Sequence, residues 1–160
     1  MNIAPPAWLP ELFPAEPWHR DTYDRLYEVF ERDFIRTQPS YKGSPIWVFP
    51  ELEDGKLVIF WHLTSREDHG TGIRYPDIER CTKLPWVKCL IEQAGSRPEI
   101  RDWDFEEGDG KIHTYIQLLG WDFVVILKKY PDGRRRLVSA YCIDFEHKRQ
   151  KLQKKYENRL

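Results

Sequence analysis

IRDWDFEEGDGKIHTYIQLLGWDFVVILKKYPDGRRRLVSAYCI, residues 100–143, is the stretch that decides the fold. Turn residues, including Gly108, Gly110 and Gly133, interrupt it, and glycine supplies the positive φ that tight turns require. Between the turns lie segments of strand length that are rich in β-branched and aromatic residues, at 100–105, 112–119, 121–130 and 137–143. Strands joined by short turns pair in antiparallel order, so the stretch predicts an antiparallel meander.

Helical patterns lie on both sides of this meander. Between residues 21 and 36, apolar side chains recur every three or four positions and charged side chains fill the opposite face, which predicts an amphipathic helix. The side chain of Asp21 or Thr22 can cap its first turn. A final helix is predicted from residue 144, and its plausible buried residues are Phe145, Leu152 and Tyr156.

The middle of the chain adds a hairpin and two short helices. Strands are predicted at 46–49 and 57–61, joined through a turn at 53–56, and helices at 76–83 and 86–94. The order of elements favours an α+β fold. We expect an N-terminal helix, an antiparallel sheet of about four to six strands with helices packed on one face, and a C-terminal helix.

Length and composition indicate one domain. The chain has 160 residues, enough to bury a core without disulfides or metals. Residues 1–17 contain five prolines together with Trp8, Leu9 and Phe13, which prevents a regular helix but allows burial. We expect an extended proline- and aromatic-rich arm at 1–17 and an α+β core at 18–160.

Charge and cysteine content restrict the class of protein. The formal net charge is −1, so any binding of nucleic acid must come from a local patch. No stretch approaches the ~20 apolar residues of a membrane span, and the first residues do not resemble a signal peptide. The three cysteines argue against structural disulfides. We expect a cytoplasmic protein that does not contact a membrane, and its oligomeric state stays open.

The strongest candidate chemistry begins where the apolar run 57–61 ends. His62 follows the run directly, and Arg66, Arg74 and Arg80 come next. Histidine can move a proton near neutral pH, and the planar guanidinium group matches the oxygens of phosphate. This segment therefore points to phosphodiester chemistry, with His62 as general acid or base and the arginines as phosphate-binding residues.

Plainer interpretations of the same residues stay open. His62 could be a structural histidine, and each arginine could pair with a carboxylate nearby in the sequence. The loop at 64–75 is long and contains two glycines, so it could close over a ligand. His62, His69, Cys81 and Cys89 lack the paired spacing of zinc ligands. We therefore expect no metal and no cofactor.

The last strand of the meander contributes two hydroxyl groups. Ser139 and Tyr141 are two residues apart, so they face the same side of a strand. They could hydrogen-bond a phosphate or a leaving oxygen, and the tyrosine could stack on a base, although Tyr141 could also be a core residue. Positive charge gathers at 134–136 and 147–159, which is either a solvated surface or a binding face.

A family resemblance covers roughly residues 56–160. It rests on FWHLTSRED (60–68), IERC (78–81), LPWVKCLIE (84–92), DFVVILKK (122–129) and RRLVSAYCIDFEHKRQKLQKKYE (135–157). These segments resemble phage- and mobile-element-associated proteins of the barnase, EndoU, colicin and RelE-like nuclease superfamily. The resemblance implies a helix before a four-stranded antiparallel sheet, and RNA cleavage of the kind that toxins perform. It also implies that His62 is an acid or base, that Arg66 and Arg80 bind phosphate, and that Ser139-Ala140-Tyr141 is the late-strand pattern.

We therefore expect a metal-independent, ribonuclease-like domain of the toxin type, acting on RNA phosphodiesters. The assigned residues are His62, Ser139 and Tyr141 as catalytic or site-lining groups, and Arg66, Arg74 and Arg80 for phosphate. Two other classes stay open: a noncatalytic accessory or immunity-type protein that binds a cognate protein or inhibitor, and an RNA-binding module without catalysis. The nuclease hypothesis requires these residues to meet in one open cleft.

Overall fold

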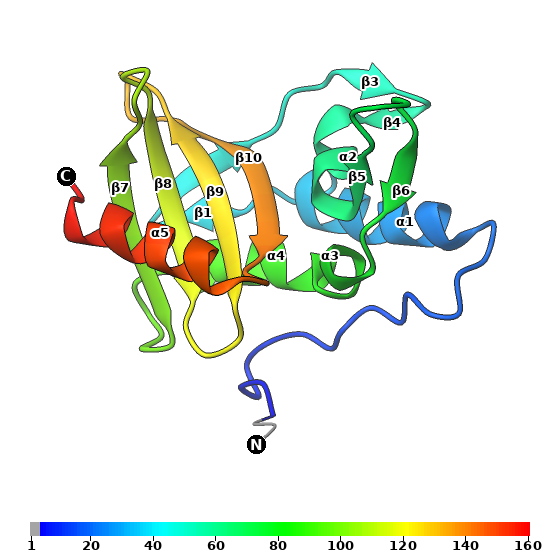
Figure 1. Ribbon diagram of the computed structural model, residues 1–160, viewed down its shortest axis with the longest axis horizontal. Coiled ribbons are helices and arrows are strands. Elements are labelled where there is room, and N and C mark those ends of the chain that lie inside the picture. Colours follow the sequence, from blue (N-terminus) through cyan, green and yellow to red (C-terminus); the bar gives the residue numbers. More distant parts are fainter. Residues whose placement is uncertain (1–3) are drawn as a thin grey trace.

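The computed structural model describes residues 4–160 and contains a curled sheet with helices packed around it (Figure 1). The helices and strands, in chain order, are α1 Thr22–Phe34, β1 Ser40–Tyr41, β2 Ser44–Trp47, β3 Leu52–Glu53, β4 Lys56–Leu57, α2 Val58–Thr64, β5 Ser65–Glu67, β6 Arg74–Pro76, α3 Ile78–Thr82, α4 Leu84–Gln93, β7 Ile100–Glu106, β8 Ile112–Leu118, β9 Phe123–Lys129, β10 Arg135–Cys142 and α5 Glu146–Glu157. The predicted α+β class is confirmed.

The main sheet has six strands in the order β1-β2-β10-β9-β8-β7. Strands β7 to β10 form the predicted antiparallel meander, and the short strand β2 pairs in parallel with β10. The register of β10 against β9 shifts between Leu137 and Ser139. Beyond this shift, Ser139 lies opposite Ile126 and Tyr141 lies opposite Val124, so both side chains share the face of those residues.

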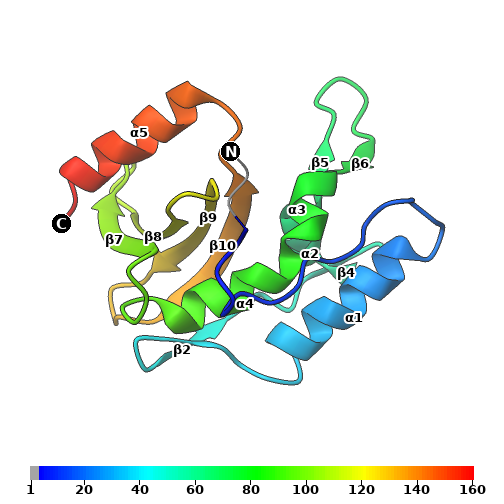
Figure 2. The same cartoon turned by 90° about the horizontal axis from the view of Figure 1, so that it is seen from below.

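The two faces of the sheet pack against different helices (Figure 2). One face contributes Ile116, Val125 and Leu127, each 0% exposed, to a core that includes residues of α1, α2 and α4. The opposite face contributes Tyr115 and packs against Leu152 of α5 in a second cluster. Because side chains alternate along a strand, α5 and α4 lie on opposite faces of the meander.

The predicted strand at 57–61 is wrong, because most of this run is helical. Only Leu57 belongs to a strand, β4, and Val58 starts α2. The run favours a strand by propensity, but in a helix Ile59, Phe60 and Leu63 are all buried. The Phe60 ring lies 4.9 Å from that of Tyr27 and 5.7 Å from that of Phe30, so packing against α1 overrides local preference.

The rest of the predicted hairpin is partly correct. A turn at Asp54 and Gly55, both with positive φ, joins β3 to β4 as predicted, but these strands have only two residues each. The strand predicted at 46–49 ends at Trp47 and pairs with β10 instead. His62 is therefore positioned by a helix and not by the end of a strand.

The described part of the N-terminal arm, residues 4–17, runs without a regular helix or strand and packs on α3 and α4. The backbone N–H of Phe13 donates to the carbonyl of Thr82 at 2.9 Å, and Trp86 Nε1 donates to the carbonyl of Pro10 at 3.0 Å. These two hydrogen bonds attach the described part of the arm to α3 and α4. The prediction for residues 1–3 lies outside the described part of the chain.

Two details of the predicted helix ends are corrected. In α5 Leu152 is 2% exposed, as expected for its buried face, but Phe145 is 57% exposed and lies just before the helix. At α1 the Asp21 side chain makes no capping hydrogen bond, and the Thr22 hydroxyl accepts from the backbone N–H of His19. Within residues 4–160, no helix has the length and apolarity needed to cross a membrane.

Candidate functional site

Two adjoining hollows lie beside the face of the sheet that carries Ser139 and Tyr141. The first, of about 340 Å³, is lined by His62, Ser65, Arg66, Glu67, His69, Arg74, Arg80 and Ser139. The second, of about 600 Å³, is lined by Arg80, Glu107, Asp109, His113, Tyr115, Ile126, Tyr141, Lys148, Lys151, Leu152 and Lys155. Arg80 lines both hollows, so we call them together the basic groove.

All six residues assigned from the sequence line this groove, although they come from five different elements. His62 lies on α2, and Arg80 lies on α3. Ser139 and Tyr141 lie on β10, the strand that α2 and α3 contact. The remaining two, Arg66 and Arg74, lie on the small β5–β6 hairpin. Their chemical roles stay predictions.

Arg80 occupies the junction of the two hollows. Asp77 caps α3 by accepting from the Arg80 backbone N–H at 3.2 Å, and it also pairs with Arg80 Nε at 3.4 Å. Arg80 Nη1 donates to the carbonyl of His62 at 2.9 Å. Within residues 4–160, Arg80 Nη2 has no hydrogen-bond partner. The guanidinium group is therefore held in place and keeps a donor for a ligand.

Arg66 and Arg74 each form one ion pair with a carboxylate among the described residues. Arg66 Nε lies 3.5 Å from Asp77, the same carboxylate that pairs with Arg80, and its side chain is 70% exposed. Arg74 pairs with Glu53 at 3.1 Å and donates to the Ser65 hydroxyl at 3.1 Å. Glu67 also lines this hollow, so its three guanidinium groups lie near three carboxylates, and Arg66 and Arg80 share one of these, Asp77.

The pKa of the His62 imidazole suits a general base. Burial and the positive charge of Arg74 lower the pKa of its imidazole below the usual value of 6.5. The ring is therefore largely neutral near pH 7 and can accept a proton. Because α2 is anchored by Phe60 in the core, packing sets the position of the His62 backbone, while the His62 side chain itself is exposed.

Sequence reasoning missed Glu107 and His113 of the second hollow, whereas Lys155 belongs to the basic segment 147–159, which was predicted to be either a solvated surface or a binding face. Lys155 Nζ donates to Glu107 at 3.0 Å and to the Tyr115 hydroxyl at 2.8 Å, and Tyr115 also donates to Glu107. His113 Nδ1 lies 3.4 Å from Glu107. Burial lowers the pKa of His113, which its neighbour Glu107 partly offsets. The spacing of His113 and Tyr115 along β8 indicates that they share one face of the strand. The sequence does not show that this face lies beside α5 and remains open, so it could not place them in a site.

Helix α5 brings part of the basic tail to the groove. Lys148, Lys151 and Lys155 line the second hollow, one turn apart along the helix. Lys148 pairs with Asp144 at 2.8 Å, and Lys155 pairs with Glu107. Lys151 has no ion-pair partner among residues 4–160. Lys151 thus offers the second hollow a positive charge that no ion pair compensates among the described residues.

Tyr141 and Ser139 line the second and the first hollow, respectively. Neither hydroxyl makes a hydrogen bond within the described part of the chain. Tyr141 also packs against the second core cluster, so it is partly a core residue. Burial, followed by the negative charge of Glu107, raises the pKa of the Tyr141 phenol, which therefore keeps its proton near neutral pH.

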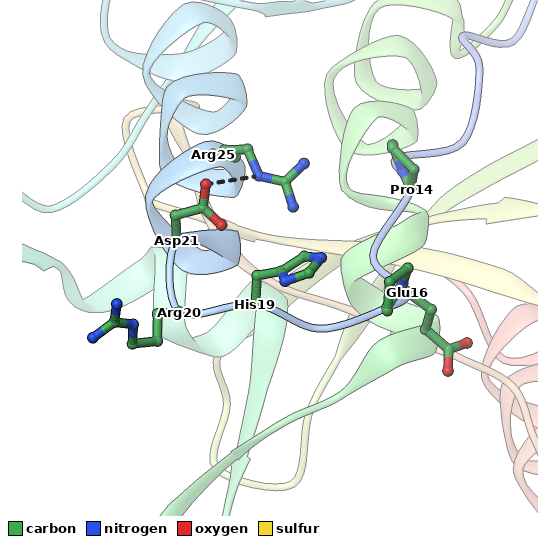
Figure 3. Close-up of a pocket in the computed structure, with 7 residues that line it drawn as sticks. Pro14, Glu16, His19, Arg20, Asp21 and Arg25 are labelled. Atoms are coloured by element: carbon green, nitrogen blue, oxygen red, sulfur yellow. Dashed lines mark ion pairs between the residues drawn. The ribbon is translucent and has the colours of Figure 1, made fainter.

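A larger hollow, of about 770 Å³, lies between the arm and the start of α1 (Figure 3). Asp21 and Arg25, one turn apart at the start of α1, pair with each other at 3.6 Å on one side of it. Arg20 and Glu16 extend away from each other, and the exposed His19 has no ion-pair partner among residues 4–160. No set of groups converges there, so the basic groove is the better candidate site.

Metal ligands do not gather in the groove. No group of three or more His, Cys, Asp or Glu side chains within residues 4–160 has the arrangement of a metal site. Burial raises the pKa of the Cys81 thiol to about 12, and this thiol donates to the carbonyl of Thr64. The buried thiol is therefore unreactive near neutral pH.

Replacing Glu107 with glutamine is expected to lower the pKa of His113 further. The negative charge of Glu107 stabilises the imidazolium form, so its removal leaves burial and Lys155 to favour the neutral ring. The midpoint of the His113 signals in an NMR pH titration measures this change. Glu79→Gln, which removes a carboxylate paired with Lys83 instead, is the control. An unchanged midpoint in Glu107→Gln would contradict the contact.

Comparisons of the chain with protein-family models, with curated proteins and with solved structures give no match.

Proposed function

We propose that the basic groove binds RNA and that its centre cleaves the RNA phosphodiester without a metal. The observation that carries the proposal is the position of Arg80, which lines the hollow of His62 and Ser139 as well as the hollow of Tyr141. A phosphate held by Arg80 would have a proton acceptor on one side and a proton donor on the other. This is the pair of groups that phosphodiester transfer requires.

His62 and Tyr141 account for both proton transfers of the cleavage reaction. Neutral His62 takes the proton of the ribose 2′-hydroxyl, and the 2′-oxygen forms a bond to phosphorus. The bond from phosphorus to the 5′-oxygen breaks, and Tyr141 gives that oxygen its proton. The products are a 2′,3′-cyclic phosphate and a 5′-hydroxyl, and solvent then carries the proton from His62 back to Tyr141. Arg80 and the Ser139 hydroxyl stabilise the charge that develops on the nonbridging oxygens.

A cleavage assay in the presence of a chelator tests the proposal. The wild-type protein is expected to cleave labelled RNA into products with cyclic phosphate ends. His62→Ala should reduce the rate by about 10²–10⁴-fold, the usual contribution of a general base. His19→Ala is the matched control, because His19 is exposed and lines a different hollow. Equal rates for His62→Ala and wild type, or no cleavage by either, would overturn the catalytic assignment.

The pH dependence of cleavage follows from the lowered pKa of His62. The base works only when it is deprotonated, so the rate should fall as the pH falls through that pKa. We expect an acid limb with its midpoint below 6.5 and a level rate near pH 7. Initial rates in buffers of constant ionic strength measure the limb. A midpoint above 6.5 would contradict the assignment of His62 as the base.

A noncatalytic module predicts a different outcome. If the protein binds RNA but the chelated assay yields no product, the groove serves recognition only. The accessory or immunity-type class instead predicts that RNA does not bind at all. Since cleavage and retention are measured separately, the same preparations of protein distinguish the three classes.

A further inference from the structure

A row of aromatic and cationic side chains extends from the basic groove along the same sheet. We call it the aromatic row, and it consists of Phe49, Arg136, Trp47, Tyr130 and Lys128. The Trp47 ring lies 5.1 Å from that of Phe49 and 5.6 Å from that of Tyr130. The Arg136 guanidinium lies 4.0 Å from the centre of the Phe49 ring, and Lys128 Nζ lies 4.9 Å from the centre of the Tyr130 ring. Three aromatic rings thus lie next to one another, with a cation against the ring at each end.

The strand register places this row on the face that forms the groove. Arg136 lies opposite Lys128, which lies opposite His113 of the groove. Trp47 of β2 lies opposite Arg136 on the other side. At the other end, Phe49 and Arg136 line a small hollow together with His62. The aromatic row is therefore continuous with the basic groove at His62 and at His113.

The rings of the row are at least partly exposed, and its two cations form no ion pairs with the described residues. Phe49 is 43% exposed, and Trp47 and Tyr130 are partly exposed. Arg136 donates to the Tyr130 hydroxyl at 3.0 Å, but neither Arg136 nor Lys128 has an ion-pair partner within residues 4–160. The Trp47 Nε1 is shielded from solvent and has no hydrogen-bond partner in the same part of the chain. Aromatic rings that only packed in the core would be buried, and they would not carry cations without ion-pair partners.

We infer that the aromatic row binds single-stranded RNA and leads it into the basic groove. Exposed aromatic rings on a sheet face offer stacking surfaces to unpaired bases, and nearby cations neutralise the phosphates between them. Double-stranded RNA keeps its base faces inside the helix, so it could contact only the cations. The inference rests on the proposed function, and it specifies the substrate as unpaired RNA with bases stacked on Phe49 and Trp47.

Binding of labelled RNA by the full chain tests the inference. Fluorescence anisotropy compares a single-stranded oligonucleotide with the same strand annealed to its complement, using His62→Ala to prevent cleavage. Single-stranded RNA should bind more tightly, and Phe49→Ala should weaken that binding by about fivefold or more, as expected for one lost stacking contact. Leu12→Ala, which truncates a 48% exposed side chain of the arm, is the control.

A second variant separates stacking from charge. Arg136→Gln should reduce the salt dependence of binding, whereas Phe49→Ala should leave it unchanged, because only the arginine displaces counterions from phosphate. Equal affinity of Phe49→Ala and the control, or tighter binding of the duplex, overturns the inference. If RNA binding is then still weakened by Arg80→Ala, the proposed function of the basic groove stands without the aromatic row. If RNA does not bind at all, the proposed function and the inference about the aromatic row both fail.

Discussion

Replacing Arg80 with alanine is expected to reduce RNA cleavage by about 10²–10³-fold, the usual cost of removing one preorganised group that stabilises transition-state charge. Arg80 is the residue that the two hollows of the basic groove share. Its guanidinium is fixed by Asp77 and by the carbonyl of His62, so little reorganisation is needed when a phosphate arrives. The loss should appear in kcat more than in KM, since the charge develops during the reaction.

Two further variants make this result specific to Arg80. Arg80→Lys keeps the positive charge but loses the planar guanidinium group that can donate two parallel hydrogen bonds to a phosphate. Its cleavage rate should therefore lie between those of Arg80→Ala and wild type. Arg20→Ala removes an exposed arginine at the hollow beside α1 and should leave the rate unchanged. Thermal unfolding of each protein establishes that it is folded. If folded Arg80→Ala cleaves within about threefold of wild type, the groove does not use this arginine for charge stabilisation.

Asp77 explains why the arginines of the groove need not be lost to ion pairing. It caps α3, and it is the only carboxylate within 4.0 Å of either Arg66 or Arg80 among residues 4–160. One negative charge cannot neutralise two guanidinium groups. Partly exposed ion pairs also contribute little to stability, so a phosphate can compete for the same donors. The salt-bridge interpretation of these arginines and their assignment to phosphate are therefore compatible.

The meander could be predicted because its pattern is local. Alternating side chains and glycine turns at Gly110 and Gly133, both with positive φ, define β7 to β10 without reference to the rest of the chain. Strand β9 starts at Phe123 and not at 121, because Asp122 adopts a positive φ in the preceding turn. Such a boundary depends on one backbone angle, which the apolar pattern does not reveal.

Helix α2 could not be predicted because its cause is tertiary. The run from Val58 to Trp61 has the residues of a strand, and only the aromatic side chains of α1 make a helix the better arrangement. The site shows the same limit. His62 and the arginines could be selected by residue type, but Glu107 and His113 join them only through the strand register and the position of α5. Neither is a property of a local stretch of sequence.

Replacing Phe60 with alanine is expected to destabilise the protein by about 3–5 kcal/mol, the usual cost of truncating a buried phenylalanine. The Phe60 side chain is 0% exposed and its ring contacts those of Tyr23, Tyr27, Phe30 and Trp61. The free energy of unfolding in urea measures the loss. Phe145→Ala, which truncates a ring that is 57% exposed, should cost less than about 1 kcal/mol.

Phe60→Ala also tests whether the packing of α2 positions His62. Because Phe60 anchors α2, a cavity at this position should loosen the helix and reduce cleavage even at temperatures where the protein remains folded. Phe60→Leu keeps most of the volume, so it should cost less stability and retain more activity. Activity and the free energy of unfolding should therefore fall together in the order wild type, Phe60→Leu, Phe60→Ala. If Phe60→Ala lost stability but kept the full cleavage rate, the anchoring of His62 through α2 would be refuted.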